Sequence, residues 1–435
     1  MKGLKLAFVV LLVGWVTVGL TSLGEAFHSG GVAECDGCHS MHSAEADGAF
    51  LLQGSDQSST CMLCHLHTGD SGPDSYHVVT ADADMPAGRA PLQRTPGGDF
   101  GWLKKTYTFI VGGITTTETG DSHGHNVIAK DFGYTPDATH ATAPGGTFPS
   151  MQLGCISCHD PHGKYRRLST GLISKSGAPI IGSGSYDNSY GNSTTKPIPA
   201  GQAVGAYRLL AGAGYTKGGV TFNGVPPAVA PSTYNQTEGT NQVRVAYGVS
   251  ISNGHTTWSN WCATCHGAMH STGNYVHPVD TAMNGTLINR YNLYVSSGIM
   301  TGSFTGSRTG QGPFTSLVPF TQNTGNYTLL GANAKSDGSR LGGPSGGDQV
   351  SCLSCHRAHA SGFPDMLRWQ MEGEFITYVD GSGNTVWPGT DTTPDSPQFA
   401  RGRTSAETLA AYYNRPATVF GAYQRVLCNK CHARD

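Results

Sequence analysis

The sequence predicts a mostly irregular chain with short α-helices and a few short β-strands, built around bound groups rather than around one apolar core. Glycine contributes 61 of the 435 residues, about twice its usual share. Only 37% of the residues are hydrophobic, against roughly 45–50% apolar residues in a typical globular domain. Side-chain burial alone would not offset the ordering entropy of such a chain. The third observation, a repeated C-x-x-C-H motif, indicates which bound groups replace the core.

Six C-x-x-C-H motifs use all twelve cysteines of the chain. This is the spacing at which two cysteines attach covalently to one haem while the next histidine binds its iron. Covalent attachment is expected at Cys35, Cys38, Cys61, Cys64, Cys155, Cys158, Cys262, Cys265, Cys352, Cys355, Cys428 and Cys431. The proximal iron ligands are expected at His39, His65, His159, His266, His356 and His432. The predicted fold class is a multihaem cytochrome c, wrapped around a stacked chain of six c-type haems.

Structural zinc and disulfide bonds are the alternative uses of repeated C-x-x-C pairs. Neither needs a histidine directly after every pair, yet all six pairs have one. The regularity therefore favours haem.

The second axial ligand decides what each haem can do. An open iron can bind and reduce a small molecule, whereas a second histidine restricts the haem to electron transfer. Twelve of the 18 histidines lie outside the motifs, enough to close every iron. The favoured distal ligands are His42, His162 and His359, three residues after a motif histidine, and the loop residues His77, His125 and His277. His28, His67 and His270 rank lower, and His123, His140 and His255 are expected to be ordinary polar residues.

An electron-transfer protein is therefore expected rather than an enzyme. None of the six motifs carries the lysine that replaces the histidine in some multihaem reductases, and no nucleophile elbow, P-loop or dinucleotide fingerprint is found. A monomeric periplasmic or extracellular electron shuttle, or a reductase with one open haem, is the alternative. The net charge of −2 gives no indication of nucleic-acid binding.

Residues 1–26 are expected to be a cleaved secretory signal peptide. Lys2 and Lys5 precede an uncharged run over residues 6–20, and Gly24 and Ala26 place small residues before a cleavage site. An uncleaved anchor is the alternative. No later segment has the ~20 apolar residues of a membrane span. Residues 27–435 are expected to form a single hexahaem domain that is exported through the periplasm, where c-type haem is attached.

Few regular elements are expected between the motifs. Alternating apolar residues predict strands at 106–111 and 242–249 and a hairpin of 375–379 with 385–387. Helices are predicted at 287–297, 364–373, 405–414, which follows a capping box at Thr404 and Glu407, and 417–429. The Gly/Ser/Thr-rich tracts 171–205 and 298–347 are interpreted as ordered coil around the haems.

Seven stretches make the chain similar to a known family. They are FHSGGVAEC from residue 27, MPAGRAPLQRTPGGDFGW from 85, CHDPHGKYRR from 158, VAPSTYN from 229, RVAYG from 244, SCLSCHRAHASGF from 351 and YQRVLCNKCHA from 423. With all six motifs in register, the chain resembles the filament-forming extracellular hexahaem cytochromes of metal-reducing bacteria. The tracts 171–205 and 298–347 carry no motif of that family.

This resemblance implies stacked bis-histidine haems and subunits that polymerise head to tail into a conductive filament. It also implies that His42 binds the fifth haem, at Cys352, Cys355 and His356, of the neighbouring subunit. The expected partners are further copies of the chain, outer-membrane or periplasmic cytochromes as electron donors, and extracellular metal oxides, electrodes or partner cells as acceptors.

Overall fold

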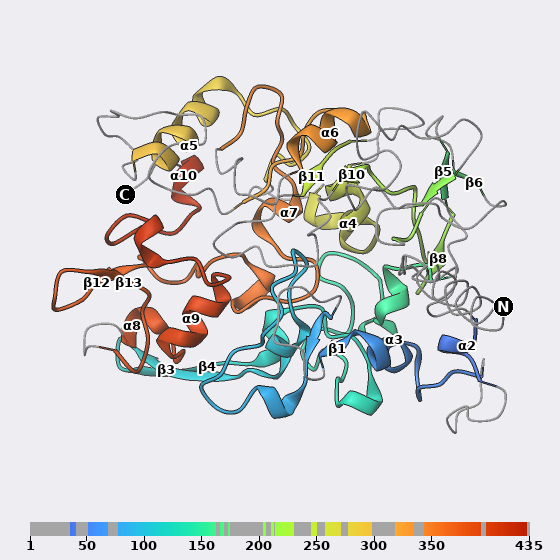
Figure 1. Cartoon of the computed structure of the whole chain (residues 1–435), viewed down its shortest axis with the longest axis horizontal. Helices are drawn as coiled ribbons and strands as arrows, with labels where there is room; N and C mark the ends of the chain where they lie inside the picture. The colour runs from blue at the N-terminus through green and yellow to red at the C-terminus, as the bar shows by residue number, and fades with distance from the viewer. Residues whose placement is uncertain are drawn as a thin grey trace, which may run out of the picture.

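The computed structural model describes residues 35–40, 51–67, 77–161, 166–168, 173–174, 203–205, 210–212, 214–229, 245–249, 257–270, 277–297, 318–334, 343–392 and 397–432. Most of this part of the chain is irregular, and its longest helix has 13 residues. The predicted irregular chain with short helices and strands is therefore confirmed. Turns and loops link the short elements across the whole molecule (Figure 1).

The α-helices are α2 (Cys35–Cys38), α3 (Gln57–His65), α4 (Trp258–His266), α5 (Gly285–Ser297), α6 (Tyr327–Asn333), α7 (Cys352–Cys355), α8 (Pro397–Ala400), α9 (Ser405–Ala411) and α10 (Asn429–His432). The 3-10 turns are η1 (Asp82–Asp84), η2 (Phe100–Lys104), η3 (Gly120–His123), η4 (Lys130–Phe132), η5 (Ser150–Gln152), η6 (Cys155–Ser157), η8 (Gly267–His270), η9 (Pro364–Met366) and η10 (Ala417–Val419). Many of these elements coincide with a haem motif.

The strands are two to five residues long. They are β1 (Leu66–His67), β2 (Val79–Thr80), β3 (Tyr107–Val111), β4 (Ile114–Glu118), β5 (Arg166–Leu168), β6 (Ile173–Ser174), β7 (Ala203–Gly205), β8 (Thr216–Lys217), β9 (Val220–Thr221), β10 (Ala228–Val229), β11 (Ala246–Tyr247), β12 (Tyr378–Val379) and β13 (Thr385–Val386). Strands β1 and β2 pair in parallel, β5 lies between β6 and β7, and the other pairs are antiparallel hairpins or ribbons.

The longest hairpin, β3–β4, places the carboxylate of Glu118 in the protein interior. Gly112 and Gly113 have the positive φ angles of 59° and 81° that a tight two-residue turn requires. The register places Tyr107 opposite Glu118 at the base of the hairpin, where both side chains are buried. The exposed tip is formed by Ile110, Val111 and Ile114.

Four predicted elements are confirmed. The first strand is β3, the hairpin is β12–β13, and the helix at 287–297 is α5. Helix α9 begins after the predicted capping box: the Thr404 side chain accepts from the Glu407 N–H, and the Glu407 carboxylate accepts from the Thr404 N–H.

Two predicted helices are wrong. In 364–373 only the turn η9 forms, because Asp365 and Met366 adopt left-handed φ angles of 56° and 57° that end the helix. In 417–429 only η10 forms, because Phe420 is extended and Arg425 pairs with Phe375 in a β-bridge instead.

Of the predicted strand at 242–249, residues 245–249 are described, and within them β11 covers Ala246–Tyr247. Its partner β10 pairs with these two residues. Residues 242–244, most of the tract 171–205, and residues 298–317 and 335–342 lie outside the described residues. The described parts of the second tract, 318–334 and 343–347, are not coil throughout, since they include helix α6.

The buried apolar residues of the described chain fall into four clusters rather than one. The largest includes a stack of Trp387 on Tyr412, with ring centroids 4.0 Å apart and planes at 6°. A second surrounds Trp258 at the start of α4, and a third includes Met62 in α3. These clusters pack around the motif helices, as expected of a core divided by bound groups. Among the described residues, no helix combines the length and hydropathy that crossing a membrane would require.

Candidate haem sites

Short helical turns carry the haem motifs. A helix places residues i, i+3 and i+4 on one face, so C-x-x-C-H in a helical turn directs both cysteines and the histidine to the same side. Motifs 2 and 4 lie at the C-terminal ends of the nine-residue helices α3 and α4. Their N-termini are capped by Asp56, which accepts from the Ser59 N–H at 2.7 Å, and by Thr257, which accepts from the Asn260 N–H at 3.0 Å. None of the eleven motif cysteines whose side chains are described forms a disulfide.

The motifs follow one another in space in the order in which they follow in the sequence. Sulfur atoms of consecutive motifs lie close enough to interact electrostatically or by hydrogen bonding. The pairs are Cys38 with Cys61, Cys61 with Cys155, Cys158 with Cys265, Cys262 with Cys352, and Cys355 with Cys428 and Cys431. The path runs from α2 at one end of the long axis to α10 near the other (Figure 1). The six candidate haem sites therefore form a single row.

Three motif histidines each face one predicted distal histidine. The ring centroids of His125 and His266 are 6.1 Å apart, those of His159 and His359 are 6.4 Å apart, and those of His277 and His432 are 6.1 Å apart. An imidazole nitrogen lies about 2 Å from a bound metal and the ring centroid about 1 Å farther, so two rings on opposite faces of one iron are roughly 6 Å apart. The donor sets and spacings of the three pairs fit a six-coordinate haem iron.

Backbone carbonyls orient four of the histidine rings. The Nδ1 atoms of His125 and His266 lie 2.9 Å from the carbonyl oxygens of Ala358 and Pro144. Those of His356 and His359 lie 2.6 and 3.3 Å from the carbonyls of Asp365 and Gly98. A ring that donates its Nδ1–H in this way leaves Nε2 as the atom that can bind a metal.

Burial keeps two of the distal candidates neutral. Burial, reinforced by the neighbouring His266, lowers the pKa of His125 to about 4. Burial and the neighbouring His159 lower the pKa of His359 to about 3. Since neutral imidazole is the form that binds iron, both rings are held in the form that ligation requires.

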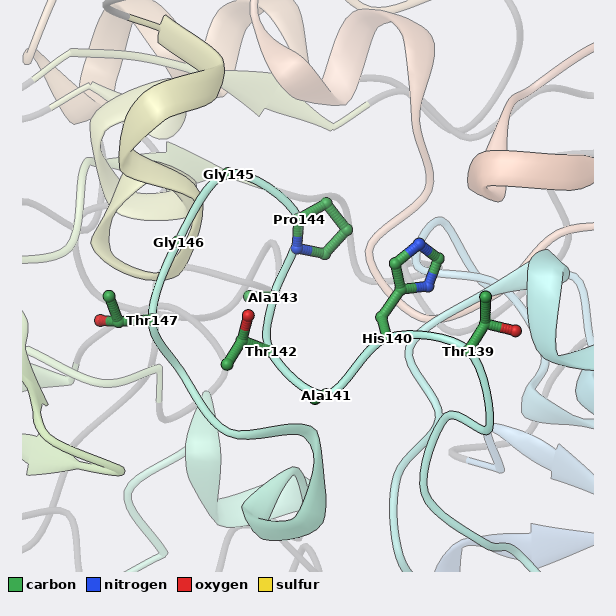
Figure 2. Close-up of a pocket in the computed structure, with 9 residues that line it drawn as sticks. All are labelled: Thr139, His140, Ala141, Thr142, Ala143, Pro144, Gly145, Gly146 and Thr147. Atoms are coloured by element: carbon green, nitrogen blue, oxygen red, sulfur yellow. The ribbon is translucent and has the colours of Figure 1, made fainter.

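The loop 139–147 holds His266 in place. Pro144 supplies the carbonyl for His266, and Gly146 approaches the Cys265 carbonyl so closely that a Cβ would lie 1.7 Å from its oxygen. The loop lines an open hollow of about 520 Å³. Figure 2 shows it running from Thr139 at one end to Thr147 at the other, with Gly145 at its far bend. The contacts of Pro144 and Gly146 with His266 and Cys265 make this loop a support for the fourth motif.

The remaining histidines have different environments. His77 is 8% exposed, and His270 Nε2 lies 3.6 Å from the Cys352 sulfur, beside the fifth motif. His123 is fully buried and uses both ring nitrogens, with Trp102 O at 3.0 Å and Glu118 Oε1 at 2.6 Å, so it cannot bind iron as well. His140 is half-exposed and contacts Asp137.

Four histidines lie outside the described residues: His28, His42, His162 and His255. For His67 the structure describes only the backbone, in β1. The carbonyl groups that orient the rings could not be found from the sequence, because any residue type supplies one.

Searches against family models found no match. The chain is 51% identical over 432 residues to the C-type cytochrome OmcS of Geobacter sulfurreducens, with 94% of each chain covered. It is also similar to two solved structures, the outer membrane cytochrome S filament and the OmcS nanowires of Geobacter sulfurreducens. Each gives a TM-score of 0.81, at 48% and 49% identity, over 94% of this chain and all of the other. With its C-x-x-C-H motifs in one spatial row, the chain belongs to the OmcS family of C-type cytochromes.

Proposed function

We propose that this chain carries six covalently bound haems, each with two histidine ligands, and conducts electrons along an extracellular filament of its own subunits. The observation that carries the proposal is the set of three histidine pairs with centroids 6.1–6.4 Å apart. In this proposal His359 binds haem 3, His125 binds haem 4 and His277 binds haem 6. With His42 assigned to haem 5 of a neighbouring subunit, His77 and His162 are left of the favoured set for haems 1 and 2.

The residues of the chain perform three tasks in this function. The cysteines would attach consecutive haems side by side, and the paired histidines would close each iron to substrates. The backbone carbonyls at His125, His266, His356 and His359 would leave Nε2 of these rings as the iron ligand. When bound, haem supplies an iron that changes reversibly between two oxidation states. No substrate pocket is needed, because electrons pass between neighbouring groups in the row.

Carbon monoxide should not bind to the reduced native protein. All six irons are expected to have two histidine ligands, so the Soret band should not shift when carbon monoxide is added to the dithionite-reduced protein. A shift corresponding to one haem in six would instead support the alternative, a reductase or shuttle with one open haem.

Polymerisation is proposed from the filament structures of the relatives and from the direction of the haem row. Elements α2 and α10, which carry parts of motifs 1 and 6, lie toward opposite ends of the long axis (Figure 1). A contact repeated head to tail between these ends does not close on itself and builds a filament. The row of haems would then continue from each subunit into the next.

Replacing His42 with alanine should abolish filaments while leaving six haems in each chain. The proposed ligand to haem 5 of the neighbour is lost, whereas the C-x-x-C-H motifs of the chain itself are intact. Negative-stain microscopy measures filament formation, and intact mass measures haem attachment. His140→Ala is the control, because His140 is half-exposed and contacts only its own loop in the described structure. Normal filaments from the His42→Ala protein would contradict ligation between subunits.

We further propose that residues 1–26 are removed on export and that residues 27–435 act as one hexahaem domain outside the cell. The donors would be outer-membrane or periplasmic cytochromes, and the acceptors metal oxides, electrodes or partner cells.

A further inference from the structure

Motifs 2 and 4 lie on two helices of the same design. Helix α3 and helix α4 each have nine residues, each end at the motif histidine, and each begin after a residue whose side chain caps the third backbone N–H of the helix. Each also has a buried serine three residues before the first cysteine of its motif: Ser58 before Cys61, 2% exposed, and Ser259 before Cys262, fully buried. The two helices therefore present serine and cysteine in the same register.

Each serine binds the backbone of the next motif. The Ser58 hydroxyl accepts a hydrogen bond from the Cys155 N–H at 3.1 Å, although the two residues are 97 positions apart. The Ser259 hydroxyl accepts from the Cys352 N–H at 3.4 Å, across 93 positions. In both cases the donor is the first cysteine of the following motif.

The turns that receive these bonds are also alike. In motif 3 the Gly154 N–H donates to Ser157 Oγ at 3.1 Å, and in motif 5 the Ser351 N–H donates to Ser354 Oγ at 3.1 Å. After each motif, a distant N–H donates to the carbonyl of the second cysteine: Ala211 to Cys158 at 2.8 Å, and Arg368 to Cys355 at 2.9 Å. The chain thus contains one two-haem unit twice, as motifs 2 and 3 and as motifs 4 and 5.

The serine contact lies where the two haem sites of each unit meet. The Cys61 sulfur lies beside the Cys155 sulfur, and the Cys262 sulfur lies beside the Cys352 sulfur. In the mature protein these sulfurs would be the thioether links of consecutive haems. Motif 6 differs, since Arg425 takes the place of the serine and pairs with Glu374 at 2.9 Å.

We infer that Ser58 and Ser259 are positioning residues, which fix the spacing and relative orientation of haems 2 and 3 and of haems 4 and 5. The inference rests on the proposed function, because it requires a haem at each motif. Loss of the hydroxyl leaves the partly buried N–H of Cys155 or Cys352 without its acceptor, which costs free energy, so the receiving turn is expected to shift away from the helix. A shift of the turn should in turn change the distance and angle between the two haems.

Circular dichroism in the Soret band tests this inference, because closely spaced haems give a paired signal whose amplitude depends on their distance and angle. Ser58→Ala and Ser259→Ala should each lose part of this amplitude, and the double variant should lose the sum, since the two units do not share these contacts. The absorption spectrum should remain that of bis-histidine haem. Haem count by intact mass should remain six.

Ser59→Ala is the matched control. Ser59 is the neighbouring residue in α3, is fully buried, and uses its hydroxyl to bind Asp56 at 3.0 Å and the Asp131 N–H at 3.2 Å, with no contact to another motif through these bonds. Its Soret dichroism should be that of the native protein. The inference is overturned if the Ser58/Ser259 double variant keeps the native signal, if Ser59→Ala loses as much amplitude, or if the serine variants lose a haem. Fewer than six haems in the native protein would instead contradict the proposed function.

Discussion

Replacing Arg403 with methionine should lower the free energy of unfolding by about 3–5 kcal/mol, the usual cost of removing one partner of a buried ion pair. The Arg403 side chain is 1% exposed and pairs with Glu118, whose side chain is 5% exposed. Arg403 also donates from Nε to the Gly362 carbonyl at 2.9 Å and lies over the Tyr107 ring at 4.3 Å. Methionine fills a similar volume, but it leaves the Glu118 carboxylate with its contact to His123 and without the arginine.

Denaturant unfolding followed by far-ultraviolet circular dichroism measures this effect, on proteins in the same state of assembly. Arg425→Met is the control, because its pair with Glu374 is more exposed, at 30% and 58%, and such pairs contribute about 0–1 kcal/mol. Equal losses in the two variants would contradict the role of the buried pair.

The stability difference between the native protein and Arg403→Met should depend on pH. Burial favours the neutral form of Glu118, but the hydrogen bond to His123 and the charge of Arg403 outweigh it and lower the pKa of the carboxyl. A lowered folded-state pKa stabilises the protein above the unfolded pKa of about 4.3, and this stability is lost as the pH falls through the folded value. The difference between the two proteins should therefore shrink in acid.

Replacing His359 with alanine should open one iron of the six. His359 faces the motif histidine His159 at 6.4 Å, so its loss should leave haem 3 with a single histidine. Optical and electron paramagnetic resonance spectra should then show one high-spin haem in six, and the reduced variant should bind one equivalent of carbon monoxide. Six haems should remain attached, because the cysteines are unchanged.

His123→Gln is the control for His359→Ala. His123 is fully buried and His359 is partly buried, but His123 uses its two nitrogens for Trp102 and Glu118. This variant should be less stable yet keep six low-spin haems and bind no carbon monoxide. A His359→Ala protein that stays entirely low-spin would contradict the assignment of His359 to haem 3.

The haem motifs and several short elements could be predicted from the sequence because their signals are local. The C-x-x-C-H spacing, the capping box at Thr404 and the alternation in β3 each depend on neighbouring residues. The predicted helix at 417–429 does not form, because a long-range bridge between Phe375 and Arg425, which no local pattern marks, replaces helical hydrogen bonds. Likewise, the residue types at Asp365 and Met366 do not by themselves predict left-handed φ angles.

The pairing of the histidines could not be predicted from the sequence for a similar reason. His125 is 141 positions from His266, and His359 is 200 positions from His159, so only the folded chain shows which ring faces which. The serine contacts to the next motif span 97 and 93 positions and are equally non-local. Composition could nevertheless predict that the core would be divided, since a chain with 37% hydrophobic residues cannot build a large one.

We expect a single row of bis-histidine haems to run through the chain and to continue into the next copy. Cryo-electron microscopy of the native secreted protein tests it most directly. The expected result is a filament with six haems per subunit, in which His159 and His359, His125 and His266, and His277 and His432 bind opposite faces of one iron each. A monomeric particle, or a haem with an open face inside a filament, would contradict it.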